Sequence, residues 1–321
     1  MVPAKCVEKP PFSGSTTIHW TDRDTSAVPR GALCFENIEK RYNTEMKKQL
    51  PPIGFGTADI SGDIREAVVA AICAGHRLID TARVYGSERY VGKAIARCIS
   101  DGIIRREDLF VQTKLDPSLH SYEGAIKSFH TSLEMLGITY VDQYLIHWPV
   151  PRGCEDDCYE RNRAVWKAFE TLQENGETQH IGVCNFLERH LIDIAESARI
   201  LPETNQLELH PGFQQRGLVR FCRRHGMTVE AWSPMGRGVL QTAEFEKMAA
   251  AYGKDVGQLA LRWSIQNGFI PLTRSSSQTH IKGNLNVFDF HISPEDMARL
   301  NELNTSDNHQ DIWSYKRQQM Y

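Results

Sequence analysis

Eight short apolar runs alternate with amphipathic stretches along most of the chain, and this alternation limits the possible folds more than any other feature. The clearest helical spacing lies at 121–136, where Ser121 can cap the start and Gly137 can end the helix in a left-handed conformation. Eight such strand–helix units form either a closed parallel barrel or a doubly wound sheet. The predicted strands lie at 51–55, 77–80, 109–114, 141–148, 180–185, 204–209, 228–233 and 268–273.

The glycine pattern distinguishes these two folds. A doubly wound sheet that binds a dinucleotide needs G-x-G-x-x-G at the first turn, and GFGTAD at 54–59 lacks the third glycine. The 321 residues suffice for one α/β barrel of about 250 residues with additions. We therefore predict an α/β fold with a single (β/α)8 TIM barrel domain over 46–321 that ends in a C-terminal tail. Residues 1–45 show neither structural period and are predicted to form an irregular N-terminal extension.

Composition excludes several classes of partner. A formal net charge of -3 and a pI near 6.5 give no long-range attraction for nucleic acid or anionic lipid. No apolar run approaches the ~18 residues that span a bilayer, and no apolar segment follows the charges near the N-terminus. The cysteines are irregularly spaced, and Cys154 and Cys158 lack further metal ligands nearby. We expect a cytoplasmic monomer that binds a small molecule, without a metal.

Four polar residues stand at or just after the ends of predicted strands. Asp80, Lys114 and His147 come from three successive strands, and Tyr85 follows Asp80 by five residues. In a parallel barrel all strand C-termini open on one face, so these side chains are predicted to converge there. Taken singly, the ordinary explanations are a helix cap, a rim charge, a core imidazole and a half-buried anchor. Together the four residues predict a catalytic site.

Seven separated segments resemble the aldo-keto reductase family, in order, from residue 50 to about residue 303. The resemblance implies a (β/α)8 barrel that binds an extended nicotinamide cofactor across its C-terminal mouth and reduces aldehydes or ketones. The segments are GFGT at 54–57, DTARVYGSE at 80–88, the strand ending in Lys114, SLEMLGITYVDQYLIHWP at 132–149, IGVCNF at 181–186, NQLELHP at 205–211 and SPMGRG at 233–238.

The resemblance also implies a role for each of the four polar residues. A hydride that arrives at a carbonyl carbon leaves charge on the oxygen, which must be protonated. Tyr85 would be the general acid if its pKa of ~10 is pulled toward neutrality. Lys114 and Asp80 would form the pair that lowers this pKa, and His147 would donate to the carbonyl oxygen and orient it.

The resemblance places the cofactor along the mouth, with several departures from the family pattern. Trp232 stands at the usual Tyr, Cys184 at the usual Ser, Arg274 at the usual Lys and His280 at the usual Arg. Arg274 can bind a 2′-phosphate bidentately, while a histidine attracts a phosphate less than an arginine does, so NADPH is predicted with NADH as the alternative. The predicted cofactor-binding residues are Gly56, Thr57, Asp80, Cys184, Asn185, Gln206, Trp232, Ser233, Met235, Gly236, Arg274, Ser275, His280 and Asn284.

The substrate end is less constrained. By resemblance Ala58, Val84 and Trp148 line the pocket, and Ala58 stands where a bulky aromatic is common, which predicts a wider mouth. An NADPH-dependent carbonyl reductase acting on small aldehydes or ketones accounts for all four polar residues. The alternatives are a cofactor-sensing regulatory or binding subunit, and a barrel enzyme that uses Lys114 as a Schiff-base amine. The latter leaves Tyr85 and His147 without a role.

Overall fold

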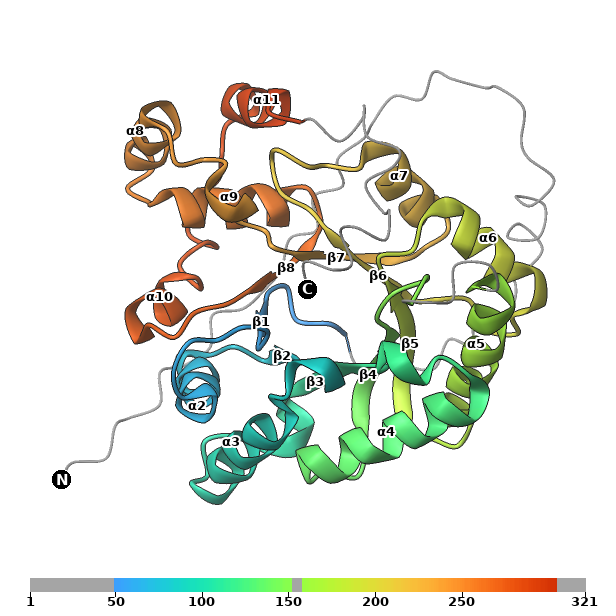
Figure 1. The fold of residues 1–321 in the computed structure, drawn as a ribbon. Coiled ribbons are helices and arrows are strands. Elements are labelled where there is room, and N and C mark those ends of the chain that lie inside the picture. Colours follow the sequence, from blue (N-terminus) through green and yellow to red (C-terminus); the bar gives the residue numbers. More distant parts are fainter. Residues whose placement is uncertain (1–48, 152–157, 305–321) are drawn as a thin grey trace, which may run out of the picture.

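The computed structural model describes residues 49–151 and 158–304. Within them, eight parallel strands close into a barrel in sequence order, and helices surround it (Figure 1). The predicted (β/α)8 fold is confirmed, and every predicted run overlaps one strand. The predicted extension over 1–45, Cys154 and the C-terminal tail lie outside the described residues. The strands are β1 Gly54–Gly56, β2 Leu78–Asp80, β3 Phe110–Lys114, β4 Val141–Ile146, β5 Thr178–Cys184, β6 Thr204–Glu208, β7 Thr228–Trp232 and β8 Ile270–Thr273.

Helices connect successive strands and form the outer layer. In the predicted helix, now α4, the Ser121 hydroxyl accepts from the Gly124 amide, and Gly137 takes a left-handed φ of 64°, which confirms both predicted ends. The helices are α2 Ile64–Ala74, α3 Glu88–Ser100, α4 Tyr122–Leu136, α5 Cys158–Glu174, α6 Glu188–Ser197, α7 Arg216–Arg224, α8 Ala243–Ala251, α9 Val256–Gln266, α10 Gln278–Gly283 and α11 Pro294–Glu302, with short 3₁₀ helices η2 Arg83–Tyr85, η3 Arg106–Asp108, η4 Pro117–Leu119 and η5 Gly236–Gly238.

Apolar packing fills four regions of the described structure, and two of them include strand residues. The main core lies between strands and helices, where Tyr144 of β4 contacts Phe129 of α4 and Phe169 of α5 at ring centroid distances of 5.0 and 4.4 Å. A second cluster, Leu78, Phe110 and Leu272, lies near the amino ends of β2 and β3 and in β8. Each fully buried side chain of this size stabilises the fold by about 1.5–3 kcal/mol. The strand ends that carry the predicted site residues are at the opposite end of β2 and β3.

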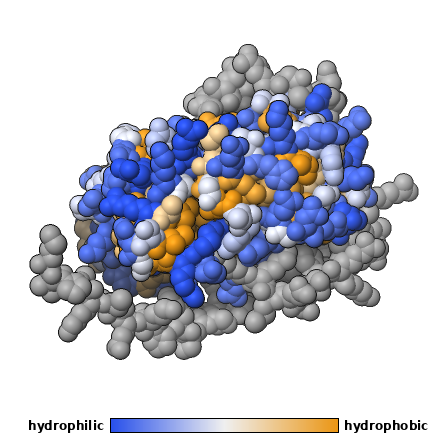
Figure 2. Space-filling view, turned by 90° about the horizontal axis from the view of Figure 1, so that it is seen from below, coloured by the Kyte–Doolittle hydropathy of each residue, from blue (hydrophilic) through white to orange (hydrophobic). Residues whose placement is uncertain are grey.

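The face of the described part that Figure 2 shows is mainly polar, with one apolar patch. Seen from the side of the barrel where α3 and α4 lie in Figure 1, apolar side chains gather in a band bordered by hydrophilic ones (Figure 2). Among the described residues, no helix is both long and apolar enough to cross a membrane.

Candidate active site

The structure brings the four predicted catalytic residues together at the carboxyl ends of the strands. The Lys114 ammonium lies 2.5 Å from Asp80 Oδ1 and also reaches the Tyr85 hydroxyl at 3.4 Å. On its other side, the Tyr85 hydroxyl lies 3.4 Å from His147 Nε2, and the two rings meet edge to face. The Tyr85 oxygen is thus shared between an ammonium and an imidazole.

Hydroxyl groups around the β2–α3 connection fix the position of Tyr85. Ser87 Oγ lies 3.0 Å from Thr57 Oγ1 and 2.9 Å from Thr81 Oγ1, and Thr57 also donates to the Asp80 carbonyl. These contacts join the ends of β1 and β2 to the start of α3. Gly86 follows Tyr85 with a φ of 65°, a conformation that costs other residues energy. The short helix η2 therefore presents the Tyr85 ring toward the mouth.

Burial and charge set the protonation of these groups. Burial raises the pKa of Tyr85 well above its ordinary value, with Lys114 opposing it. The predicted lowering of this pKa is therefore wrong, because burial of the phenolate raises the pKa more than the nearby ammonium lowers it. Burial opposes the charged form of Lys114, but Asp80 and Tyr85 raise its pKa above the ordinary value. Burial and Lys114 together lower the pKa of His147 well below 6.5. At neutral pH the site holds a phenol, an ammonium and a neutral imidazole.

A second polar layer, which the sequence did not predict, lies beside Asp80 inside the barrel. Gln112 Nε2 donates to Asp80 Oδ1 and to Glu230 Oε2, each at 2.8 Å. Gln206 Nε2 donates to Glu230 Oε2 at 2.7 Å and to Asp80 Oδ1 at 3.3 Å. The motifs do not single out Gln112 or Glu230; the signal that the sequence carries for them is a polar residue inside a strand that should be covered on both faces.

Four predicted cofactor residues on or directly after β5, β6 and β7 form a connected group. Asn185 Nδ2 donates to the His147 carbonyl and to Cys184 Sγ, and its Oδ1 accepts from the Trp232 indole at 2.9 Å. Asn185 has a φ of 66°, which is strained for a residue with a side chain. Burial raises the pKa of Cys184, so it stays a thiol and donates weakly to Gln206 Oε1 at 3.6 Å.

The predicted phosphate and adenosine residues follow β7 and β8. Ser233 has a φ of 50° and Met235 precedes η5, which begins at Gly236, so the backbone turns sharply after Trp232. Beyond β8, Ser275 accepts from the Ser277 amide and His280 lies exposed on α10. The buried Asn284 Nδ2 has no hydrogen-bond partner among the described residues. Ser277 also caps α10, as the structural explanation of this segment predicted.

Arg274 is exposed, but it is not free of contacts. Its guanidinium donates to the Ala58 carbonyl at 3.0 Å and pairs with Asp59 at 3.2 Å, which joins the loop after β1 to the loop after β8. Asp59 has a φ of 47°. Both side chains are largely exposed, so this pair contributes little to stability and an incoming anion can compete for Arg274.

The predicted substrate residues border the four predicted catalytic residues from three loops. Trp148 lies parallel to the His147 ring at a centroid distance of 6.3 Å, and Val84 precedes Tyr85 with half of its surface exposed. Ala58 follows β1 and is partly exposed, whereas Gly56 and Thr57 are buried at the end of the barrel. The exposed apolar surface of Val84 and Trp148 can contact the apolar part of a small ligand at the mouth.

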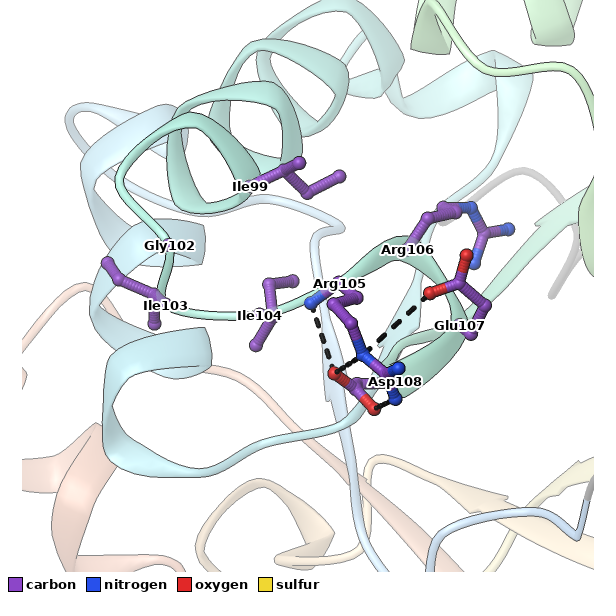
Figure 3. Close-up of a pocket in the computed structure, with 8 residues that line it drawn as sticks. All are labelled: Ile99, Gly102, Ile103, Ile104, Arg105, Arg106, Glu107 and Asp108. Carbon is purple, nitrogen blue, oxygen red and sulfur yellow. Dashed lines mark hydrogen bonds and ion pairs between the residues drawn. The ribbon is translucent and has the colours of Figure 1, made fainter. Parts of the chain in front are cut away.

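A surface hollow of about 530 Å³ lies elsewhere, along the connection between α3 and β3 (Figure 3). Its residues, among them Ile103, Arg105 and Asp108, precede the first residue of β3. Lys114 is the last residue of that strand, so the hollow is at the opposite end of β3 from the predicted catalytic residues. Arg105 and Asp108 pair with each other across it.

A (β/α)8 barrel with Asp, Tyr, Lys and His joined at its carboxyl mouth defines a class of oxidoreductases that act on carbonyl groups. The model of the aldo/keto reductase family matches residues 52–305. The chain belongs to the aldo-keto reductase family, whose members are NAD(P)H-dependent oxidoreductases acting on carbonyl or alcohol groups.

Individual relatives agree with this assignment. An uncharacterized oxidoreductase, YtbE, of Bacillus subtilis is 39% identical over 259 residues, which cover 80% of this chain and 90% of the relative. A 9,11-endoperoxide prostaglandin H2 reductase of Trypanosoma cruzi is 38% identical, covering 80% and 88%. Among solved structures, a Bombyx mori aldo-keto reductase in complex with NADP superposes with a TM-score of 0.73 at 31% identity, covering 82% of this chain and 94% of that one.

Proposed function

We propose that this enzyme is an NADPH-dependent carbonyl reductase of small aldehydes or ketones, with Tyr85 as general acid. One observation carries the proposal: the Tyr85 hydroxyl lies within 3.4 Å of both the Lys114 ammonium and His147 Nε2. A phenol between a cation and a neutral imidazole can donate its proton and have the resulting anion stabilised.

The residues along the mouth fit a nicotinamide cofactor. The Asn284 amide nitrogen, which has no partner among the described residues, and the exposed Arg274 guanidinium offer donors for the adenosine end. Asn185, Gln206 and Cys184 offer amide and thiol groups for the nicotinamide carboxamide. When bound, NADPH would supply the hydride. The positively charged guanidinium favours a 2′-phosphate, which NADH lacks.

The chain's own residues would handle the oxygen and the proton. With its proton on Nε2, the neutral His147 donates to the substrate oxygen and orients it beside the Tyr85 hydroxyl. Tyr85 then transfers its proton to that oxygen as charge develops there. The adjacent Lys114 stabilises the phenolate that remains, and Asp80 keeps the ammonium in place at 2.5 Å.

The direct test follows the loss of NADPH absorbance with a panel of aldehydes, diketones and sugars. Carbonyl-dependent oxidation of NADPH supports the proposal. If the protein binds NADPH but reduces none of the panel, the alternative of a cofactor-sensing binding subunit is favoured instead.

Arg274→Ala is expected to raise the Kd for NADPH roughly ten- to a hundred-fold and to leave the Kd for NADH nearly unchanged. The reason is the loss of a charge-assisted contact with the 2′-phosphate, worth about 1.5–3 kcal/mol. Titration of protein fluorescence with each cofactor measures both constants. Equal losses for NADPH and NADH would show that Arg274 supports the loops and not phosphate binding.

Asp59→Asn is the matched control for this experiment. It removes the carboxylate that pairs with Arg274, so it is expected to tighten NADPH binding a few-fold, because the exposed pair is weak. Because Arg274→Ala should weaken NADPH binding and Asp59→Asn should tighten it, the two variants distinguish a loss of phosphate binding from general damage to the loops.

We also propose that the enzyme works as a cytoplasmic monomer and that residues 1–45 form an extension outside the catalytic domain over 46–321. None of the matched motifs lies in 1–45. Sizing chromatography of full-length and truncated protein, each assayed for turnover, tests the oligomeric state and the domain division.

A further inference from the structure

Glu230 is a fully buried carboxylate that the proposed chemistry does not use. It lies on β7 between Val229 and Ala231, with no exposed surface. The interior of a parallel barrel is usually filled with branched apolar side chains, and a buried carboxylate is costly unless it is hydrogen-bonded. Such a residue near a catalytic Asp requires an explanation.

Two glutamine amides connect Glu230 to the catalytic group. The nitrogens of Gln112 and Gln206 each lie between the same two carboxylate oxygens, Asp80 Oδ1 and Glu230 Oε2, at 2.7 to 3.3 Å. An amide nitrogen carries two hydrogens, so each can donate once to each carboxylate. If either amide were turned over, its oxygen would face two carboxylate oxygens. Glu230 therefore helps to determine which way both amides point.

The orientation of the Gln206 amide matters for the cofactor. With its nitrogen held by Glu230 and Asp80, its oxygen faces Cys184 Sγ at 3.6 Å, in the group proposed to bind the nicotinamide carboxamide. Asp80 Oδ1, in turn, accepts from Gln112, Gln206 and Lys114. One carboxylate thus supports two parts of the site: the acceptor of Gln206 and the orientation of Asp80 toward Lys114.

We propose that Glu230 is a positioning residue for carbonyl reduction, which fixes the amide of Gln206 toward the nicotinamide end of the cofactor and, through Gln112, holds Asp80 against Lys114. The inference rests on the proposed function, because it assigns the nicotinamide to the group at Gln206. Glu230 itself contacts neither substrate nor the reacting atoms.

The charge state of Glu230 gives this arrangement a pH dependence. Burial raises the pKa of Glu230 to about 7; the Gln112 hydrogen bond lowers it, nearby Asp80 raises it, and Gln206 and Lys114 lower it. The titratable groups facing it are Asp80 from β2, Lys114 from β3 and the Cys184 thiol from β5. The ionised form is the stronger acceptor for the two amides, so the Gln206 amide is held more firmly above neutral pH.

The experiment compares two ligands, NADPH and 2′-phospho-ADP-ribose, which has the adenosine end but no nicotinamide. The ratio of their two Kd values reports on binding at the nicotinamide end alone. Titration of the 2′-phosphate affects both ligands equally and does not change this ratio. Glu230→Leu, which removes the acceptor, is expected to raise the Kd for NADPH relative to that for 2′-phospho-ADP-ribose by roughly ten-fold. This is the effect of one lost hydrogen bond to a charged group. In the same variant kcat should also fall.

Glu230→Gln separates the acceptor from its charge. Its side-chain oxygen can still accept from both amides, so most of the NADPH binding lost in Glu230→Leu should return. In the wild type the Kd ratio should favour NADPH more at pH 8 than at pH 6, by a few-fold, whereas in Glu230→Gln it should be the same at both pH values. This comparison stays informative if Glu230→Leu fails to fold.

Gln143→Leu is the matched control. Gln143 lies on β4 in register with Gln112, is fully buried, and neither atom of its amide has a hydrogen-bond partner among the described residues. This variant is expected to leave the Kd ratio and kcat unchanged. An equal effect in Gln143→Leu and Glu230→Leu, or a pH-dependent ratio in Glu230→Gln, would overturn the proposal. If the wild type reduces no carbonyl, the proposed function fails on its own, and the Kd ratios still test the role of Glu230.

Discussion

Tyr85→Phe is expected to lower kcat for carbonyl reduction by about 10²–10⁴, the usual contribution of a general acid. The change removes the one oxygen that lies 3.4 Å from both the Lys114 ammonium and His147 Nε2. Phe keeps the aromatic ring that meets the His147 ring edge to face, so the pocket should keep its shape. Single-turnover measurements with an aldehyde that the wild type reduces give the rate.

NADPH binding and a second tyrosine serve as controls. The Kd for NADPH should change little in Tyr85→Phe, because the phenol faces the substrate oxygen and not the adenosine end. Tyr122→Phe removes a phenol on α4 that contacts Thr171 and should leave kcat unchanged. A Tyr85→Phe enzyme that retains most of its kcat would exclude Tyr85 as the acid.

The pH profile of reduction follows from the protonation of Tyr85. Because burial raises its pKa above the ordinary value of about 10, the phenol keeps its proton at neutral and mildly alkaline pH. We expect kcat/KM for reduction, measured at saturating NADPH, to show no fall between pH 7 and about pH 9 and to fall only at higher pH, as the phenol ionises. A fall centred near pH 7 that is also seen in Glu230→Gln would show that Tyr85 titrates much lower than its burial implies.

The sequence was sufficient to predict that the four polar residues lie together, because this follows from one topological rule. Asp80 and Lys114 end successive parallel strands and His147 directly follows the next, and a closed parallel barrel brings all strand ends to one face. Their distance in the chain is therefore no obstacle. The eight strands were recognisable because each is short, apolar and followed by an amphipathic stretch.

The rule about strand ends does not predict the second polar layer, whose residues lie inside the strands. In TVEAW, Glu230 alternates with Val229 and Ala231, a pattern that equally fits a strand with one face in water. Only the closed barrel shows that its side chain points inward to Gln112 and Gln206. The direction of the Tyr85 pKa failed for a related reason. Burial raises this pKa and Lys114 lowers it. Which effect is larger depends on how deeply the phenol is buried, and a sequence motif does not encode that depth.

Loop geometry is the other feature that could not be predicted from the sequence. The sequence identified Arg274 as a candidate phosphate ligand but gave no indication that Asp59 would face it from the loop after β1. That contact depends on a left-handed φ of 47° at Asp59, a local conformation that residue type alone does not determine. Predicted binding residues on loops can therefore be correct in identity and still have competing partners.

Lys114→Met is expected to destabilise the fold by about 3–5 kcal/mol, because it leaves the buried carboxylate of Asp80 without its cation. In a domain of this size that corresponds to a fall in melting temperature on the order of 10 °C. Lys114 is fully buried, and Met is an unbranched side chain that can occupy much of the same space, so lost packing should be a minor contribution. Lys127→Met, on the exposed side of α4, is the control and should change stability by no more than about 0.5 kcal/mol.

The double variant Lys114→Met with Asp80→Asn identifies the cause of that loss. Breaking a buried ion pair is costly mainly because one charge remains, so neutralising Asp80 as well should recover a large part of the lost stability. Activity should not recover, since no ammonium would remain at 3.4 Å from the Tyr85 hydroxyl to stabilise the phenolate. Thermal and urea unfolding of the wild type, both single variants and the double variant give the coupling free energy. If the double variant is as unstable as the two single losses added together, then Lys114 and Asp80 do not act as a pair, and Asp80 has no role in holding the ammonium beside Tyr85.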